Sequence, residues 1–407
     1  PADDWPKPWG IRNWAVPLIF SALLRLGDAL GISSVGGRRM LLEVPQYLLH
    51  VAMLGAVWRL VARRASALAA RWALWAVALF APLVWFGGRT LSESFSTAFL
   101  VWGLERLDAR EVRPVWWVVG GALLGFAQVT RYGSAAAIAP AMLWLVLTRR
   151  WTTFALATAG GVLVAGGLGL LDWLTWGEWF HSMTHYVRFN VLSGEAAQRF
   201  GASPAWYYLP LLLLVAPFAW LGLGVSGWRR SGAPGLFVAS AVGYLLAISG
   251  TAHKEGRFLY PTLVLLTVAG APTFVQWAER RRAGAAAVVA LGLLAFVVPT
   301  PLDVQRPHQF QLTRKASADA TGYFIVNEGV WGSPGWFYLG KNIPFCVCDF
   351  PEQPCFQGAA RNPAFNRGLF VRNTADDVER NTRTEAAFEA AGFRALETRG
   401  LTTLYGR

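Results

Sequence analysis

The feature that most constrains this chain is a succession of about ten apolar runs, most of them long enough to cross a lipid bilayer as a helix. A membrane-spanning helix needs about 20 predominantly apolar residues. Hydrophobic residues make up 54% of the 407, and charged residues only 15%. A soluble protein of this composition would expose too much apolar surface. The predicted spans are residues 41–61, 72–88, 90–105, 114–130, 133–149, 152–172, 206–226, 234–250, 258–277 and 284–301.

The net charge of +13 is explained by the loops between these runs. Arginines cluster in every second loop, as the positive-inside rule expects of cytoplasmic loops. No basic stripe with interleaved aromatic residues is left over, so we expect no nucleic-acid partner. The arginines of the loops predicted to be cytoplasmic are Arg59, Arg63, Arg64, Arg71, Arg106, Arg110, Arg113, Arg149, Arg150, Arg229, Arg230, Arg280, Arg281 and Arg282.

One apolar segment, Trp14–Gly31, would reverse this topology if it crossed the membrane. Arg25 and Asp28 interrupt it, so we interpret it as a helix lying in the outer interface. The predicted organisation is then an outer loop remnant with this interfacial helix (1–40), a multispanning domain with an outer-face active site (41–301), and a soluble extracytoplasmic domain (302–407).

The last hundred residues have ordinary globular composition and alternate strand and helix signals. Residues 323–326, 369–371 and 402–405 are predicted strands, and Thr384–Ala391 is a predicted helix with Gly392 in a C-cap-like position. The predicted fold is therefore a polytopic α-helical membrane protein with a small C-terminal α/β domain outside the cytoplasm.

Three cysteines, Cys346, Cys348 and Cys355, fall together in this C-terminal segment. In an oxidising compartment, a disulfide from Cys355 to either Cys346 or Cys348 is expected. A zinc site is the alternative, but it lacks an evident fourth ligand. We therefore expect no metal.

Ionisable residues gather in the nonapeptide 253–261, between two of the apolar runs. It contains His253, Lys254, Glu255 and Arg257. Charges at a membrane boundary are either solvated flanks of a span or functional groups. Cations beside one carboxylate suit an anionic, phosphorylated ligand. The other polar segments that face the same predicted side are residues 89–94, 130–132 and 172–208.

The nonapeptide, His-Lys-Glu-Gly-Arg-Phe-Leu-Tyr-Pro, resembles the H-K-E-x-R-F-x-x-P signature of glycosyltransferase family 22. This family comprises the GPI-anchor and lipid-linked-oligosaccharide alpha-mannosyltransferases, which are membrane enzymes of the GT-C type. The resemblance extends from about Trp9 to Pro261. The C-terminal segment carries no motif of the family.

Three further elements contribute to the resemblance. Arg89–Ser94 is similar to R-T-x-S-N-S, with Glu93 in place of the usual Asn. Ser92 or Thr90 as a helix N-cap is the alternative interpretation of that element. Residues 172–208, which include Asp172 and Asn190, resemble D-x-x-x-Y-G-x-W, F-x-x-N and Y-G-x-x-P-W-x-x-Y in order. Asp172 is either a substrate-positioning acid or a charged end of a span. Residues 10–14 look like the family's I-R-S-W element.

The resemblance implies transfer of a sugar, expected to be mannose, from a dolichyl- or polyprenyl-phosphate donor to a lipid-linked glycan or glycolipid acceptor, with inversion. No cofactor beyond this donor is implied. His253, Lys254 and Arg257 are expected to bind the lipid phosphate, with Glu255 holding them and Arg131 as a weaker candidate. We expect these cations to converge with Asp172, Glu93 and Asn190 at the outer end of the bundle.

The general base is expected to be an acid of the first outer loop. The start at Pro1 suggests that most of this loop is missing, which leaves Asp3 and Asp4 as the candidates. The alternatives to a transferase are a transporter or flippase of lipid-linked glycans, and an outer-face ligase or phosphotransferase. The abundance of Arg, Ala and Gly suggests a bacterial inner membrane with the site facing the periplasm, or the endoplasmic reticulum if the source is eukaryotic.

Overall fold

The structure is a computed structural model that describes residues 11–64, 66–78, 91–109, 113–215, 235–283, 286, 287, 290, 306–326, 339–372 and 378–407. It divides into two compact units. The helical unit comprises Pro1–Leu26 and Met40–Val298, and the sheet unit comprises Gly27–Arg39 and Pro299–Arg407. Asp3 and Asp4 lie outside the described residues.

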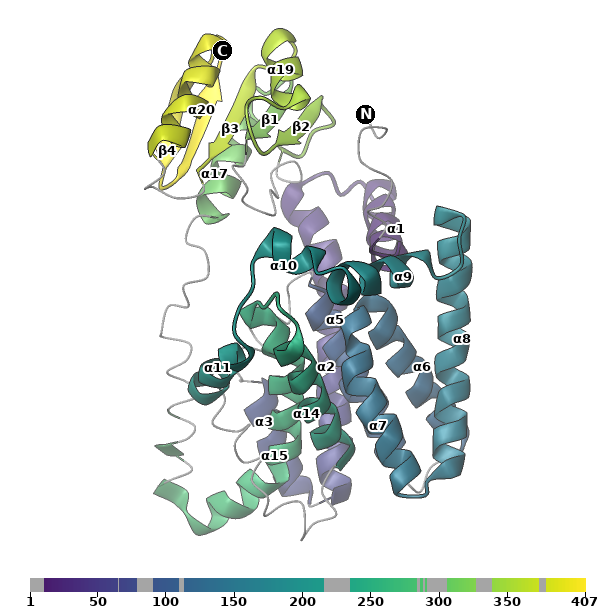
Figure 1. The fold of residues 1–407 in the computed structure, drawn as a ribbon. Helices are drawn as coiled ribbons and strands as arrows, with labels where there is room; N and C mark the ends of the chain where they lie inside the picture. The colour runs from purple at the N-terminus through teal and green to yellow at the C-terminus, as the bar shows by residue number, and fades with distance from the viewer. Residues whose placement is uncertain are drawn as a thin grey trace. The chain divides into compact units, whose positions relative to one another are not determined.

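The helical unit is a bundle whose long helices run side by side, with the short helices α9 and α10 lying across one end (Figure 1). Two of its helices, α1 and α2, include residues assigned to the sheet unit. The described helices of the helical unit are α1 (Ala15–Ala29), α2 (Val35–Arg64), α3 (Ala67–Ala78), α5 (Ser92–Asp108), α6 (Val115–Thr130), η2 (Tyr132–Ser134), α7 (Ala135–Leu147), α8 (Trp151–Trp176), α9 (His181–Val187), η3 (Arg188–Leu192), α10 (Glu195–Phe200), η4 (Ala205–Tyr207), α11 (Tyr208–Val215), α14 (Gly235–Gly250), η5 (Gly256–Leu259) and α15 (Tyr260–Arg280).

Each predicted span from 41–61 to 258–277 overlaps a described helix, and 284–301 lies largely outside the described residues. Among the described helices, α2 and α8 are long and apolar enough to cross a membrane. The count of ten spans stays a prediction. On α8, Val162, Leu163 and Leu174 are 62%, 72% and 67% exposed, which is the surface expected of a helix facing lipid.

The predicted helix in Trp14–Gly31 is present as α1, and its position in the interface stays a prediction. Leu18, Ile19 and Leu26 on α1 are about half exposed, while Gly27 is buried. This exposed apolar surface is compatible with contact to lipid.

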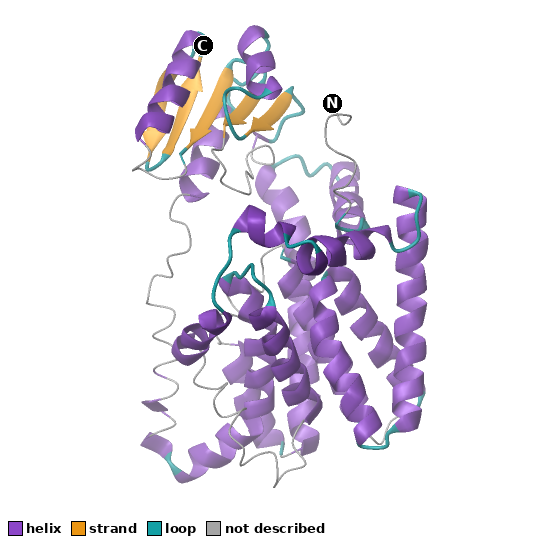
Figure 2. Cartoon of the chain, in the orientation of Figure 1, coloured by secondary structure: helices purple, strands orange, loops and turns teal. Residues whose placement is uncertain are grey.

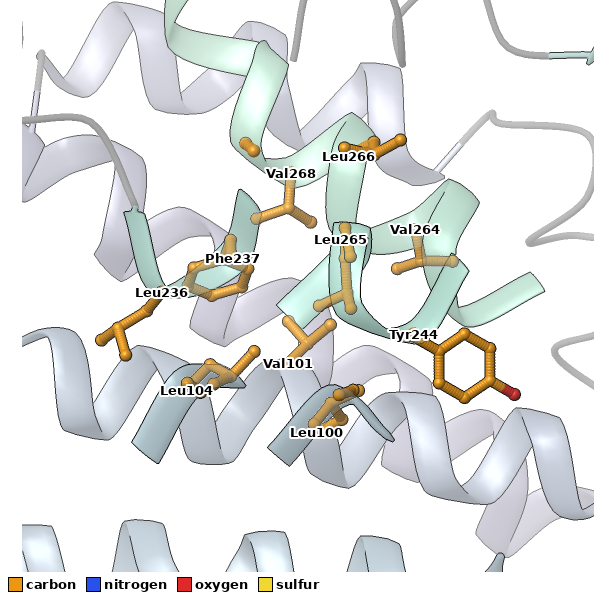
Figure 3. Packing of buried hydrophobic residues seen from close by; sticks show 14 of the residues in the cluster. Leu100, Val101, Leu104, Leu236, Phe237, Tyr244, Val264, Leu265, Leu266 and Val268 are labelled. Carbon is orange, nitrogen blue, oxygen red and sulfur yellow. The ribbon is translucent and has the colours of Figure 1, made fainter. Parts of the chain in front are cut away.

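The core of the helical unit extends over several helices, and one part of it lies where α5, α14 and α15 meet (Figure 3). Leu100, Val101 and Leu104 of α5 pack against residues of the other two helices, including Phe237 and Leu265. This packing fixes the two ends of α5 relative to the loops that follow α6 and α14, where the polar residues of interest lie.

Glycines let α6 approach its neighbours closely. A Cβ on Gly121 would lie 1.8 Å from the carbonyl oxygen of Ala157 on α8, and one on Gly160 would lie 2.0 Å from that of Val118. On the other side of α6, a Cβ on Gly103 of α5 would lie 2.9 Å from the carbonyl oxygen of Gly120. Small residues at helix contacts are typical of membrane bundles, where close backbone packing drives association.

The C-terminal end of α5 binds arginines from two of the loops predicted to be cytoplasmic. Glu105 is fully buried and pairs with Arg63 at 2.6 Å and Arg59 at 3.2 Å. Asp108 pairs with Arg64 at 2.5 Å, and Arg150 donates to the carbonyl oxygen of Leu107 at 2.6 Å. These basic residues therefore lie at one end of the bundle, as the charge pattern predicts.

The sheet unit contains a five-stranded sheet of order β2-β1-β3-β5-β4. Its strands are orange in Figure 2. β1 (Tyr323–Val326) pairs in parallel with β2 (Phe345–Cys348) and β3 (Arg367–Val371). β5 (Thr402–Gly406) pairs antiparallel with β3 and β4 (Arg394–Arg399). The described helices of this unit are α17 (Arg306–Ala316), α19 (Pro354–Arg361) and α20 (Val378–Ala390).

Side chains alternate between the two faces of this sheet, as strand geometry requires. Tyr323 and Ile325 pack in one cluster with Leu312 of α17, whereas Phe324 packs in the other with Phe388 of α20. The three predicted strands and the helix at 384–391 are confirmed, and Gly392 ends α20 in a left-handed conformation with φ +81°.

One disulfide was expected, from Cys355 to either Cys346 or Cys348, and the structure contains the one between Cys346 and Cys355. Cys348 is free and buried between the sheet and α19, and burial raises the pKa of its thiol to about 12.

Candidate active site

The candidate site begins at the first turn of α5, where Glu93 is only 2% exposed. A carboxylate in a first turn interacts favourably with the helix dipole. The N-cap residue is Leu91, and no side chain caps the helix. The interpretation of Ser92 as the N-cap is therefore wrong, because its hydroxyl donates to Glu93 Oε2 at 3.1 Å instead. Thr90 lies outside the described residues.

Arg131 reaches Glu93 from the end of α6. The backbone leaves the helix at Arg131 with φ −152° and ψ 107°, which directs the chain into the turn at Tyr132. The Arg131 Nη1 atom lies 2.7 Å from Glu93 Oε1 and donates to Ser92 Oγ at 3.2 Å. Its Nε donates to Tyr244 Oη at 3.2 Å. The guanidinium is thus buried and held by side chains of α5 and α14.

Arg257, from the nonapeptide, approaches the same carboxylate. Its Nε lies 3.6 Å from Glu93 Oε1, and its side chain is 39% exposed. Glu255 pairs with it through two contacts, 2.7 Å to Nε and 2.8 Å to Nη2. The guanidinium groups of Arg131 and Arg257 both lie over the ring of Phe258, 4.8 Å and 5.6 Å from its centroid. Phe258 therefore contacts both of the cations that share this carboxylate.

His253 completes this cluster. Its Nε2 lies 3.2 Å from Glu255 Oε1, and its ring makes an edge-on contact with Phe258. The expected contacts of Glu255 with its neighbours are present for His253 and Arg257. We call Glu93, Arg131, His253, Glu255 and Arg257 the arginine–carboxylate cluster.

Lys254 points elsewhere. Its ammonium donates to the carbonyl oxygens of Ser203, at 3.0 Å, and Thr251. Desolvation by burial lowers the pKa of this ammonium group. The neighbouring amide of Ser203 donates to Ala252 at 2.9 Å, so Lys254 ties two loop segments together. The structure does not bring its side chain into the arginine–carboxylate cluster.

Asp172 belongs to a second network. It is completely buried at the end of α8, and its Oδ2 accepts hydrogen bonds from the backbone N–H of Ser182 at 3.0 Å and from Ser182 Oγ at 2.5 Å. Ser182 Oγ in turn lies 2.5 Å from Tyr132 Oη, which accepts from Asn13 Nδ2 at 2.8 Å. Asp172 thus joins α8 and α9 to the residue that follows Arg131, and does not contact the arginines in the described part of the chain.

Asn190 lies outside both networks. Its side chain donates to the carbonyl oxygen of Tyr186 one turn earlier, at 3.0 Å. The ring of Tyr186 packs 5.2 Å from that of Tyr132 and lies under the guanidinium of Arg12 at 5.9 Å. The structure therefore does not bring the Asn190 side chain into the arginine–carboxylate cluster.

Several residues that build the site carry little signal in the sequence. Tyr244 is one of three hydroxyl-bearing residues in the apolar run 234–250, with Ser240 and Ser249, so the sequence does not single it out. Asn13 lies in the I-R-S-W-like element that was matched without a role for this residue. Ser182, which connects Asp172 to Tyr132, has no sequence signal at all, because its importance arises only when α8 and α9 fold against each other.

This arrangement can bind an anion. An arginine keeps its charge at any physiological pH and presents several donors to a phosphate group. Arg131 is buried and rigidly held, while Arg257 is partly exposed and paired with a carboxylate that an anionic ligand can replace. Among the described residues, Glu93 is the acidic side chain that contacts both arginines.

Comparison with known proteins agrees with the resemblance seen in the sequence. Residues 4–310 match the Alg9-like mannosyltransferase family. GPI mannosyltransferase 3 of Yarrowia lipolytica is 26% identical over 293 residues, which cover 68% of this chain and 55% of that protein. GPI alpha-1,2-mannosyltransferase 3 of Danio rerio is 24% identical over 311 residues, covering 72% and 55%. The chain thus spans about half the length of the curated relatives it matches.

Among solved structures, ArnT from Cupriavidus metallidurans bound to undecaprenyl phosphate is similar in fold. The TM-score is 0.67 at 14% sequence identity, and the match covers 97% of this chain and 88% of ArnT. This similarity shows a fold of the GT-C type, as the resemblance implies. On the match over residues 4–310, the chain belongs to the Alg9-like mannosyltransferase family.

Proposed function

We propose that this chain is the catalytic membrane part of a mannosyltransferase that takes mannose from a polyprenyl- or dolichyl-phosphate donor. The acceptor is a lipid-linked glycan or glycolipid on the extracytoplasmic side of the membrane. The observation that carries the proposal is the convergence of Arg131 and Arg257 on Glu93 Oε1, at 2.7 Å and 3.6 Å. A buried arginine beside an exchangeable one is suited to a lipid phosphate at the membrane surface.

The donor class is supported by chemistry and by the fold. Departure of the sugar leaves negative charge on the lipid phosphate, and preorganised cations stabilise such developing charge. The protein that shares this fold, ArnT, was crystallised with undecaprenyl phosphate. In the proposed reaction, the acceptor oxygen attacks the anomeric carbon while the bond to the phosphate oxygen breaks, so that the configuration inverts. The acceptor hydroxyl gives its proton to a base, for which Asp3 and Asp4 stay the candidates.

The orientation is supported by the two ends of α5. Glu93 lies in its first turn, and Glu105 lies twelve residues later, about 18 Å along the helix. Arg59 and Arg63 of α2 and Arg106 of α5 pair with Glu105, which favours that end as cytoplasmic. The arginine–carboxylate cluster would then face the periplasm of a bacterial multi-pass inner-membrane protein. A disulfide in the sheet unit suits the same side of the membrane.

The proposal is tested with the full-length protein in membranes, assayed for transfer of radiolabelled mannose from polyprenyl-phosphate mannose. Arg257→Ala and Arg131→Ala are expected to lower turnover by at least about 100-fold, the effect of losing one charge-stabilising group. Arg188→Ala is the control, because Arg188 is an exposed arginine in the neighbouring η3.

Equal turnover in Arg257→Ala and Arg188→Ala would contradict a phosphate-binding role for the cluster. Movement of a lipid-linked glycan across liposomes without sugar transfer would indicate a transporter or flippase instead. Consumption of a different radiolabelled lipid-phosphate sugar would indicate another transferase or ligase at the same site.

A further inference from the structure

Three potential metal ligands lie together in the turn between α8 and α9. Glu178, His181 and His185 each offer one ligand atom, and these atoms all lie within 4.8 Å of one another. Zinc binds imidazole nitrogen and carboxylate oxygen at about 2.0–2.2 Å, so ligand atoms around it are about 3.4 Å apart in a tetrahedral site. Small side-chain rotations therefore suffice to bring the three groups onto one ion.

The local backbone explains why these side chains meet. α8 ends at Trp176, and Gly177 in the left-handed conformation, with φ +79°, reverses the chain. Phe180 is also left-handed, with φ +57°, immediately before α9 begins at His181. On α9, His181 and His185 are one turn apart and lie on the same face of the helix.

His181 is already oriented for such a role. Its Nδ1 lies 2.7 Å from Glu178 Oε2, and its ring stacks on Trp176 with a centroid distance of 5.2 Å and an angle of 17°. Its second nitrogen, Nε2, is buried and has no hydrogen-bond partner in the described part of the chain. The ring of His185 lies 4.1 Å from that of His181. Two imidazoles that face each other at this distance, one with an unsatisfied nitrogen, are better explained by a shared ligand than by packing alone.

We infer that Glu178, His181 and His185 bind one divalent metal ion of the zinc type. Two imidazoles and one carboxylate are a ligand set that favours Zn²⁺ over Mg²⁺ or Ca²⁺. Glu178 is 62% exposed, so water can occupy the remaining coordination position. From the sequence we expected no metal site. The three residues do not stand out in the sequence, because only the turn between α8 and α9 brings them together.

The ion would fix α9 against the end of α8. With seven residues, α9 is too short to be stable in isolation, and the ion would add to the hydrogen bonds of Ser182 with Asp172. The two histidines are directly followed by Ser182 and Tyr186, which contact Tyr132 beside the arginine–carboxylate cluster. The metal is therefore a positioning element for the network around Tyr132 and takes no part in the transfer reaction.

The test is titration of the purified full-length protein, in detergent and after removal of metal with a chelator, with ZnCl₂. Binding is followed by calorimetry and by the Zn²⁺-dependent rise in thermal midpoint. One equivalent of Zn²⁺ is expected to bind, and His185→Asn, His181→Asn and Glu178→Gln are expected to weaken it by about 100-fold each. Tetrahedral Co²⁺ absorption bands provide an independent spectroscopic readout of the ligand geometry.

Glu195→Gln and His308→Ala are the controls, because they remove a carboxylate and an imidazole that lie outside this group. Unchanged Zn²⁺ affinity in His185→Asn and Glu178→Gln, or equal losses in the controls, would overturn the inference. Binding of Mg²⁺ with no binding of Zn²⁺ would also overturn it. Since Glu178 is exposed, Glu178→Gln keeps the test valid if a histidine variant fails to fold.

Discussion

The guanidinium of Arg131 lies 2.7 Å from the carboxylate of Glu93, and both side chains are more than nine-tenths buried. They come from the ends of α6 and α5, which are packed together by Gly103 and Gly120. Removing one partner of such a pair leaves an uncompensated buried charge. The pair therefore constrains both the stability of the bundle end and its affinity for anions.

Glu93→Gln is expected to destabilise the protein by about 3–5 kcal/mol, because Arg131 loses its buried counter-charge. A lipid phosphate can replace the lost carboxylate. We therefore expect polyprenyl phosphate to raise the thermal midpoint of Glu93→Gln more than that of the unmodified protein. Glu195→Gln, an exposed acid in the first turn of α10, is the control. If polyprenyl phosphate stabilises all three proteins equally, the phosphate does not bind at Glu93.

Asp172→Ala tests whether this acid is structural or binds substrate. Its two bonds to Ser182 would be lost, which leaves buried donors unpaired and costs about 1–3 kcal/mol of stability. Because Asp172 does not contact the arginines, we expect the KM for the donor to change less than in Arg257→Ala. A KM effect as large as that of Arg257→Ala would assign Asp172 to the substrate site.

The helices could be predicted because a long apolar run is a strong local signal, and the same holds for the buried strand 323–326. The order of the strands in the sheet could not be predicted from the sequence. β3 pairs with β1 and β5, which lie far from it in the sequence, and pairing between distant strands leaves no mark on either segment. The choice of Cys346 over Cys348 as the partner of Cys355 depends on that same arrangement, since Cys348 points into the core beneath α19.

The candidate site likewise contains some contacts that the sequence could predict and others that it could not. The contact of Glu255 with Arg257 is local, and the spacing of the nonapeptide was sufficient to predict it. Glu93 and Arg131 were each identified singly, but their pairing requires the packing of α5 against α6. Lys254 was expected in the same cluster because it is next to His253 in sequence. Instead its ammonium turns to two carbonyl oxygens, since neighbouring side chains in an extended segment point in opposite directions.

The cysteines allow a test of the sheet unit by alkylation. Burial raises the pKa of Cys348 to about 12, so its thiol stays protonated at pH 8 and becomes reactive only as the pH rises toward 12 or the unit unfolds. At pH 8, iodoacetamide is expected to label no cysteine in the folded protein, Cys348 alone after denaturation, and all three after denaturation with reduction. Labelling of Cys355 without reduction, measured by mass spectrometry, would contradict the disulfide.

The close approach of α6 and α8 gives a matched pair of variants that differ by one position. In Gly160→Ala, the added Cβ would lie 2.0 Å from the backbone oxygen of Val118, so the helices must separate. In Gly161→Ala, the nearest atom is 3.7 Å away, which is ordinary contact. Overpacking costs about 1–3 kcal/mol, whereas alanine in an unconstrained helix position is favoured over glycine by about 1 kcal/mol.

Gly160→Ala is therefore expected to lower the thermal midpoint in detergent and Gly161→Ala to leave it unchanged or raise it. Separation of the helices would also move Arg131, which follows α6, away from Glu93. The same variant should thus lose transfer activity at temperatures where it is still folded, although Gly160 lies on α8, remote in sequence from every residue of the arginine–carboxylate cluster. If both alanine variants retain the stability and activity of the unmodified protein, α6 and α8 do not pack through these glycines, and the position of Arg131 must be fixed by other contacts.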